Sequence, residues 1–228
     1  MENRQKTGAI IVAAGSSQRM GETNKIFAPL GERIILAHVV DTFQACELID
    51  QIIIVMSEKN VDWCRQLAVD EGWSKVTEVC AGGRLRQDSV TAGISHLINC
   101  HWVVIHDGAR PLVTVDLIER GLETAQETGA AVPAVGVSDT IKVAGNSRIV
   151  YETLSRHYLW AAQTPQVFSF DIITEAYRKA KGEVTDDATM VEQLGKKVKL
   201  FPGSYTNIKV TTPDDLVLAQ ALWANREK

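Results

Sequence analysis

Glycines and basic residues gather in three segments, each of which directly follows a short apolar run. The segments are residues 13–21, with Lys25 shortly after them, residues 81–89 and residues 106–111. Small residues let the backbone approach a ligand closely, and backbone N–H groups can cradle phosphate oxygens. Each segment alone is also compatible with a tight turn that carries solvated charges. Their repetition after three apolar runs favours a binding site for a polyanion.

The types of charged residue in these segments indicate the chemistry. Arg19 and Lys25 place two cations in the first segment, and Asp107 stands where the third apolar run ends. A carboxylate at the end of a buried strand suits a divalent metal or a ribose hydroxyl. Neither the G-x-x-x-x-G-K-[ST] phosphate loop nor the G-x-G-x-x-G dinucleotide fingerprint is matched, so a nicotinamide-dependent oxidoreductase is disfavoured. His106 alternates away from Asp107 and is expected to lie in the core or to support the site from behind.

The elements that must position these segments alternate between strands and helices. Buried strands are predicted at 9–13, 51–56, 75–80, 102–105, 130–135 and 198–201. Helical periodicity covers 35–43, 61–68, 86–98, 115–125, 174–181 and 186–194, and a last helix begins at Pro213 with Thr212 as its N-cap. This rhythm predicts an α/β fold with a Rossmann-like, mostly parallel sheet flanked by helices. Ligands then bind beyond the carboxyl ends of the strands, where the three segments meet.

Residues 138–156 interrupt the rhythm. Two β-like pieces, at 141–143 and 149–151, are separated by the turn residues 144–147. They predict a two-stranded β-arm that protrudes from one domain comprising residues 1–228. No repeat or linker divides the chain.

Composition excludes several classes of protein. Lys and Arg number 24 against 28 for Asp and Glu, and this net charge of −4 argues against a nucleic-acid binder. The apolar run at 9–14 is far shorter than the roughly 20 residues of a membrane span. No secretory leader is evident. The four cysteines lack metal-ligand spacing, which favours free thiols in a cytoplasmic protein.

The motifs, taken in order, resemble those of the 2-C-methyl-D-erythritol 4-phosphate cytidylyltransferase family of the non-mevalonate isoprenoid pathway. AAGSSQRMG at 13–21 with Lys25 is similar to the signature loop of nucleotidyltransferases. The resemblance continues through GGRLRQDS at 82–89, HDGARP at 106–111, DTIK at 139–142, QTPQ at 163–166, TDDA at 185–188, NIKVT at 207–211 and PDDL at 213–216. It therefore covers nearly the whole chain.

This resemblance implies Mg²⁺-dependent transfer of CMP from CTP to methylerythritol phosphate, by a homodimer whose β-arms embrace. The catalytic residues it implies are Arg19, Lys25, Arg156 and Lys209. The nucleotide-binding residues it implies are Ala13, Ala14, Gly15, Gly82, Gly83, Ser89, Asp107 and Ala109, with Asp107 also near the metal. The implied substrate-binding residues are Arg110, Thr140, Arg156, Thr164, Thr185 and Lys209, with Thr140 and Arg156 contributed by the partner subunit.

One departure from the family pattern and two rival functions stay open. An acidic residue is common after the paired glycines, where this chain has Arg84. A ribitol-5-phosphate cytidylyltransferase would share the nucleotide loops, and a non-catalytic nucleotide-binding scaffold could share the fold. The nucleophile of the implied reaction is a phosphate monoester with a second pKa of about 6, so no general base is required.

Overall fold

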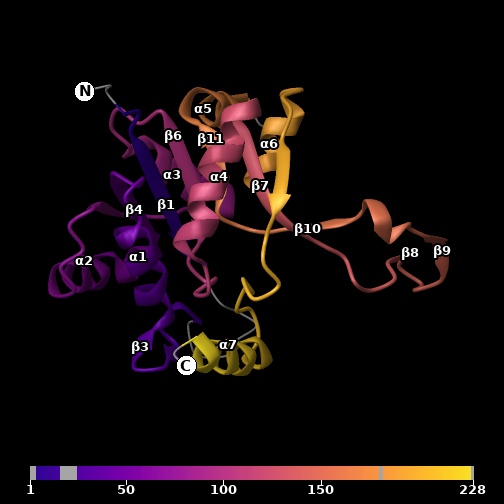
Figure 1. Ribbon diagram of the computed structural model, residues 1–228, viewed down its shortest axis with the longest axis horizontal. Helices are drawn as coiled ribbons and strands as arrows, with labels where there is room; N and C mark the ends of the chain where they lie inside the picture. Colours follow the sequence, from indigo (N-terminus) through magenta and orange to yellow (C-terminus); the bar gives the residue numbers. More distant parts are fainter. Residues whose placement is uncertain (1–3, 16–24, 180–181, 227–228) are drawn as a thin grey trace.

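The computed structural model describes residues 4–15, 25–179 and 182–226. Within them, eight strands form one sheet in the order β10-β7-β11-β6-β1-β4-β5, with β12 paired to β7 (Figure 1). The strands of this sheet are β1 (Thr7–Ala13), β4 (Gln51–Met56), β5 (Val76–Ala81), β6 (Trp102–Asp107), β7 (Ala130–Gly136), β10 (Trp160–Ala162), β11 (Gln166–Ser169) and β12 (Lys199–Pro202).

Helices cover both faces of this sheet, as the alternation of strands and helices predicts. They are α1 (Ile35–Ala45), α2 (Val61–Asp70), α3 (Arg86–Ser95), α4 (Val115–Thr128), α5 (Phe170–Lys179) and α6 (Asp187–Gln193). A further helix, α7 (Pro213–Arg226), packs outside the sheet. Short 3₁₀ turns occur at η2 (Lys25–Phe27), η3 (Glu58–Asn60) and η4 (Arg156–Tyr158). No helix in the described part of the chain is long and apolar enough to span a membrane.

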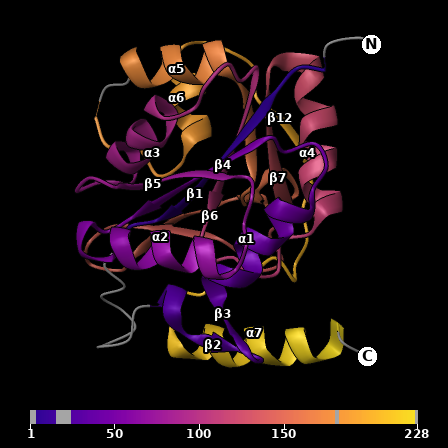
Figure 2. The same cartoon turned by 90° about the vertical axis from the view of Figure 1, so that its left-hand side faces the viewer.

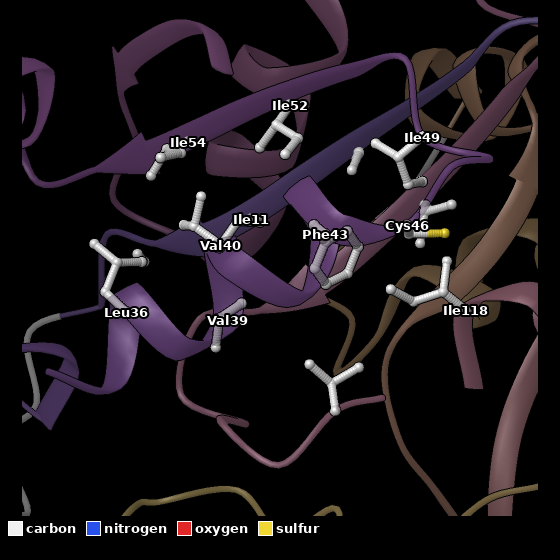
Figure 3. Packing of buried hydrophobic residues seen from close by; sticks show 14 of the residues in the cluster. Ile11, Leu36, Val39, Val40, Phe43, Cys46, Ile49, Ile52, Ile54 and Ile118 are labelled. Atoms are coloured by element: carbon white, nitrogen blue, oxygen red, sulfur yellow. The ribbon is translucent and has the colours of Figure 1, made fainter. Parts of the chain in front are cut away.

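The alternation of side chains along the strands divides the core into two layers. Ile11, Ile52 and Ile54 pack with α1, α2 and α4 on one face, where Phe43 is fully buried (Figure 3). Ile10 and Ile53 face the other side, against α3, α5 and α6 (Figure 2). Burial on both faces explains why these strands are continuous apolar runs.

The sheet is mixed, with more parallel than antiparallel pairs, in agreement with the predicted mostly parallel sheet. Strands β5, β4, β1 and β6 are parallel neighbours, and β12 runs parallel to β7. The strands β10 and β11, which periodicity did not reveal, pair antiparallel with β7, and β11 also pairs antiparallel with β6. Both are short, and β11 begins only at the last residue of the QTPQ motif, directly after turn-like residues.

Two small hairpins lie outside this sheet. The predicted β-arm is present as β8 (Lys142–Ala144) and β9 (Val150–Thr153), and it projects away from the rest of the molecule (Figure 1). The second hairpin, β2 (Pro29–Leu30) with β3 (Arg33–Ile34), was not predicted. It packs against α7 through a satellite cluster that includes Leu30, Val210 and Ala219 (Figure 2).

The ends of several elements differ from those that periodicity predicts. Helix α3 ends at Ser95 instead of 98, and α5 begins at Phe170, four residues before the predicted start. The start of α7 at Pro213 is as predicted, and Thr212 caps it by accepting a hydrogen bond from the Asp215 backbone. Cys46, Cys64 and Cys80 are buried free thiols and Cys100 is partly buried, as the spacing of the cysteines indicated.

Candidate active site

A pocket of about 390 Å³ opens at the carboxyl ends of β1, β5 and β6, in the range of small-molecule sites. All three glycine-containing segments contribute to its wall, as the fold prediction required. Its lining residues are Val12, Ala13, Ala14, Gly15, Lys25, Ile26, Gly83, Arg84, Leu85, Arg86, Ser89, Asp107, Ala109 and Lys209.

One wall of the pocket depends on the absence of a side chain at Gly82. A Cβ atom at Gly82 would lie 2.5 Å from Ser89 Oγ and 2.6 Å from Ala14 Cβ, so any larger residue would displace this wall. Ser89 is only 2% exposed, and its hydroxyl lies 3.2 Å from the Leu85 carbonyl oxygen. Gly82 is therefore a supporting residue behind the lining, and Ala14 and Ser89 form a narrow surface in front of it.

Asp107 is surrounded by three cations. Lys209 Nζ lies 2.7 Å from Asp107 Oδ2, Arg86 Nε lies 3.3 Å from Oδ1, and Arg110 Nε lies 3.7 Å from Oδ2. Burial alone would raise the pKa of Asp107, but the charges of Arg86 and Lys209 hold it well below its usual range. Asp107 and Asp187, whose carboxylate also pairs with Arg86, leave one net positive charge among these groups, so this part of the pocket attracts anions.

Arg86 joins this cluster to helix α6. Its Nη1 and Nη2 atoms each lie 2.7 Å from a carboxylate oxygen of Asp187, in a two-pronged contact. The Asp187 side chain is fully buried and also accepts a hydrogen bond from the Tyr177 hydroxyl at 2.5 Å. Arg86, which stands in the GGRLRQDS motif but was given no role from sequence, therefore holds the Asp107 region to the segment containing Thr185.

A chain of hydrogen bonds fixes the backbone at Asp107. The Asp107 N–H donates to Thr164 Oγ1 at 3.0 Å, and Thr164 Oγ1 lies 3.0 Å from His106 Nδ1. His106 Nε2 in turn lies 3.2 Å from the Arg110 carbonyl oxygen. Burial lowers the pKa of His106 to about 3, so the ring is neutral at physiological pH. The only consistent assignment has Thr164 donating to Nδ1 and Nε2–H donating to Arg110.

The loop that carries Lys209 is fastened to the same region. Asn207 Nδ2 donates to the Thr164 carbonyl oxygen at 2.8 Å, and Arg110 Nη1 donates to the Asn207 carbonyl oxygen at 2.7 Å. The Val210 N–H donates to the Ala109 carbonyl oxygen at 2.8 Å. Lys209 is therefore held beside Asp107 by contacts on both sides of it in the chain.

Comparison with known proteins supports the same family as the motifs. The model of the 2-C-methyl-D-erythritol 4-phosphate cytidylyltransferase family matches residues 7–225. The enzyme of that name from Dehalococcoides mccartyi is 49% identical over 218 residues, which cover 96% of each chain. The one from Alkaliphilus oremlandii is 42% identical over 234 residues, covering 100% of this chain and 99% of the relative.

The chain belongs to this cytidylyltransferase family. A solved structure described as 4-diphosphocytidyl-2C-methyl-D-erythritol synthase, from Anaerococcus prevotii, has the same fold, with a TM-score of 0.85 and 30% identity. The match covers 96% of this chain and 99% of that one. The family resemblance and the fold expected from it are therefore confirmed.

The predicted site residues of this family member divide into those that line the pocket and those that do not. Lining residues include Lys25, Lys209, Asp107 and most of the predicted nucleotide-binding set. Arg110 and Thr164 lie behind the lining and position Asp107, and Thr185 is exposed next to the N-cap of α6. Arg19 lies outside the described residues.

Thr140 and Arg156, which the family resemblance places in a partner's site, lie at the base of the β-arm. Both are exposed, and neither lines the pocket of its own chain. Arg156 Nη1 donates to the Ser138 carbonyl oxygen at 2.7 Å, which fixes the side chain near the start of the arm.

The one carboxylate among the lining residues of the pocket fits a magnesium ion only if a substrate mainly carries that ion. Among the described residues, no cluster of three or more His, Cys, Asp or Glu side chains could hold a metal. Asp107 is the carboxylate that lines the pocket. Mg²⁺ is commonly bound by one or two carboxylates together with substrate phosphates, so Asp107 suffices as the protein's ligand only when a triphosphate supplies the others.

Proposed function

We propose that this pocket transfers CMP from CTP to the phosphate of 2-C-methyl-D-erythritol 4-phosphate. The products are 4-diphosphocytidyl-2-C-methyl-D-erythritol, an isoprenoid precursor, and pyrophosphate. The observation that carries the proposal is the cluster of Lys209, Arg86 and Arg110 around Asp107, in a pocket that Lys25 also lines. The family match favours this activity over transfer to ribitol 5-phosphate and over a non-catalytic scaffold.

The nucleotide would lie across the strand ends, with its base against the wall formed by Ala14, Gly83 and Ser89. These three lining residues are uncharged, and a compact pocket at this wall would suit a pyrimidine and exclude a larger purine ring. The triphosphate would then lie toward Lys25 and the cations near Asp107. Arg19 is assigned to the triphosphate from the family motif alone.

The acceptor phosphate would be held by Lys209, with Thr185 contacting the acceptor from the segment before α6. Arg110 supports this side through its contact with the Asn207 carbonyl oxygen. Lysine supplies a compact, mobile charge that can move from Asp107 to an incoming phosphate. Supporting this assignment, Lys209 is only partly buried, with its side chain 37% exposed.

The reaction needs positioning and charge neutralisation rather than a general base. The acceptor phosphate is mostly dianionic at neutral pH, since its second pKa is about 6. Its oxygen attacks the α-phosphorus of CTP in line, the bond to the β-phosphate oxygen breaks, and pyrophosphate leaves. Lys25 and Lys209 stabilise the charge as it moves from acceptor to leaving group. Mg²⁺, when bound to the triphosphate beside Asp107, supplies further neutralisation of negative charge.

A homodimer formed through the β-arm would complete the site with Thr140 and Arg156. A two-stranded hairpin is at best marginally stable alone, and the side chains of Ile149, Tyr151 and Tyr158 are exposed on and beside this arm. A second copy of the chain would cover them, and two-fold pairing is the commonest symmetric arrangement.

Pyrophosphate release tests the proposed activity. The purified protein with Mg²⁺ and CTP is assayed with methylerythritol phosphate and, separately, with ribitol 5-phosphate. Release that requires methylerythritol phosphate supports the proposal. Release with ribitol 5-phosphate instead would establish the rival enzyme, and release with neither acceptor, although CTP binds, would favour the scaffold.

A further inference from the structure

Arg84 is a cation on the pocket wall to which the proposed mechanism assigns no role. It lines the pocket between Gly83 and Leu85, and it is exposed. Within the described parts of the chain, its side chain makes neither a hydrogen bond nor an ion pair. Arg86 and Lys209, by contrast, are each held by Asp107. Arg84 therefore has open hydrogen-bond donors at a ligand site.

The surroundings of Arg84 indicate which part of a nucleotide it meets. Its neighbours on the wall are uncharged: Gly83 and Leu85 flank it, and Ser89 and Ala14 close the same side. This loop follows β5, the edge strand, whereas Asp107 ends β6, and β1 and β4 lie between these two strands. The cations that attract phosphate gather at Asp107, so the wall next to Arg84 is left for the base. This step rests on the proposed function.

Cytosine and uracil present different hydrogen-bond donors and acceptors to a guanidinium group. Arginine carries only donors, and its planar fork presents two adjacent N–H groups. Cytosine presents two neighbouring acceptors, N3 and O2, which match the fork. Uracil has an N–H at position 3, so one of the two donors would face another donor.

We propose that Arg84 donates to N3 and O2 of the cytosine ring and thereby selects CTP over UTP. A bidentate contact of this kind discriminates between bases by about ten- to a hundredfold. A guanidinium at the same place could instead bind the triphosphate. That contact would depend on charge alone, and it would affect CTP and UTP equally because their phosphates are identical.

The test compares kcat/KM for CTP and UTP, with methylerythritol phosphate as acceptor, in Arg84→Gln, Arg84→Lys and wild type. Arg178→Gln is the matched control, because Arg178 is exposed on α5 and absent from the pocket lining. Competitive binding of CMP and UMP is measured alongside, so that recognition of the base is read even without turnover. Wild-type turnover with CTP checks the proposed function separately from Arg84.

A contact between Arg84 and the base and a contact between Arg84 and the triphosphate predict different kinetics for the variants. If Arg84 reads the base, Arg84→Gln lowers kcat/KM for CTP about ten- to a hundredfold and barely changes that for UTP. Arg84→Lys, which keeps the charge but loses the fork, also loses most of the preference. An equal fall for both nucleotides in Arg84→Gln, with recovery in Arg84→Lys, would overturn the proposal in favour of a phosphate contact. Unchanged ratios in all variants would overturn it as well.

Discussion

Lys209 Nζ and Asp107 Oδ2 lie 2.7 Å apart although helices α4, α5 and α6 and strands β7 to β12 lie between them in the chain. Asp107 ends β6, whereas Lys209 belongs to a loop that hydrogen bonds fasten to residues 109 and 110. Arg86 and Arg110 lie beside the same Asp107 carboxylate as Lys209. If Lys209 moves to an entering phosphate, as proposed, Asp107 is still paired with Arg86.

Lys209→Ala is expected to lower turnover by about 10²–10³-fold, the usual effect of losing one preorganised charge contact in a transition state. Steady-state kinetics with both substrates measures it. Lys199→Ala is the matched control, because Lys199 forms an exposed ion pair with Glu127 far from the pocket lining. Such surface pairs contribute little to stability. Equal behaviour of the two variants would contradict the assigned role.

Lys25→Ala and Arg19→Ala are each expected to reduce turnover by a similar factor of about 10²–10³ with the fold intact. Lys25 lines the pocket, and Arg19 is included from its motif. Circular dichroism and thermal unfolding check the fold, and exposed Lys59→Ala is the control. Near-normal turnover in both variants would mean that the loop is structural.

The pattern of the sequence predicted most of the fold because buried parallel strands are nearly continuous apolar runs. The strands at 9–13 and 51–56 were found in this way, whereas the arm at 138–156 was found from the turn residues between two short β-like pieces. The strands β10 and β11 were missed because each is short and is stabilised by pairing to β7 rather than by its own periodicity. Tertiary pairing of this kind leaves no local signal.

The residues that line the pocket were predictable where a loop directly follows a strand. Residues that support a lining residue from behind were harder to predict. Gly83, Ser89 and Asp107 line the pocket as expected. Thr164 was expected to bind substrate, but it is 4% exposed and bonded to the Asp107 backbone and to His106. A lining residue and a supporting one occur in the same motif, so only their positions in the fold distinguish them.

The pH dependence of kcat/KM should follow the ionisation of the acceptor phosphate rather than that of a protein side chain. His106, with a pKa of about 3, stays neutral, and Asp107, whose pKa is lowered, stays charged across the assay range. Below about pH 6 the acceptor phosphate gains a proton, so kcat/KM for the acceptor should fall about tenfold per pH unit. With an acceptor analogue whose phosphate ionises at lower pH, this fall in kcat/KM should begin at a lower pH. If the fall in kcat/KM begins at the same pH with the analogue, the group that titrates belongs to the enzyme.

Thr164→Val is expected to lower kcat at least tenfold, whereas Thr164→Ser should restore it. Valine matches threonine in shape but leaves the buried Asp107 N–H without its acceptor, a loss of about 1–3 kcal/mol. The measurement combines thermal unfolding with kcat and both KM values. A purely structural role predicts lower stability with unchanged kcat in the folded fraction. Loss of kcat at a temperature where the variant is fully folded identifies a positioning role.

Mixing two inactive variants tests whether the β-arm serves the neighbouring site. If Arg156 and Thr140 act in the partner's pocket, a dimer of one Lys25→Ala chain and one Arg156→Ala chain has one site with both defects and one with neither. Random exchange makes half of the dimers mixed, so activity should recover toward about a quarter of the wild-type level. Arg148→Ala, on the same arm, is the control variant. By itself it should not lose activity as Arg156→Ala does. No recovery, with exchange confirmed by mass spectrometry, would mean that each chain builds its site alone.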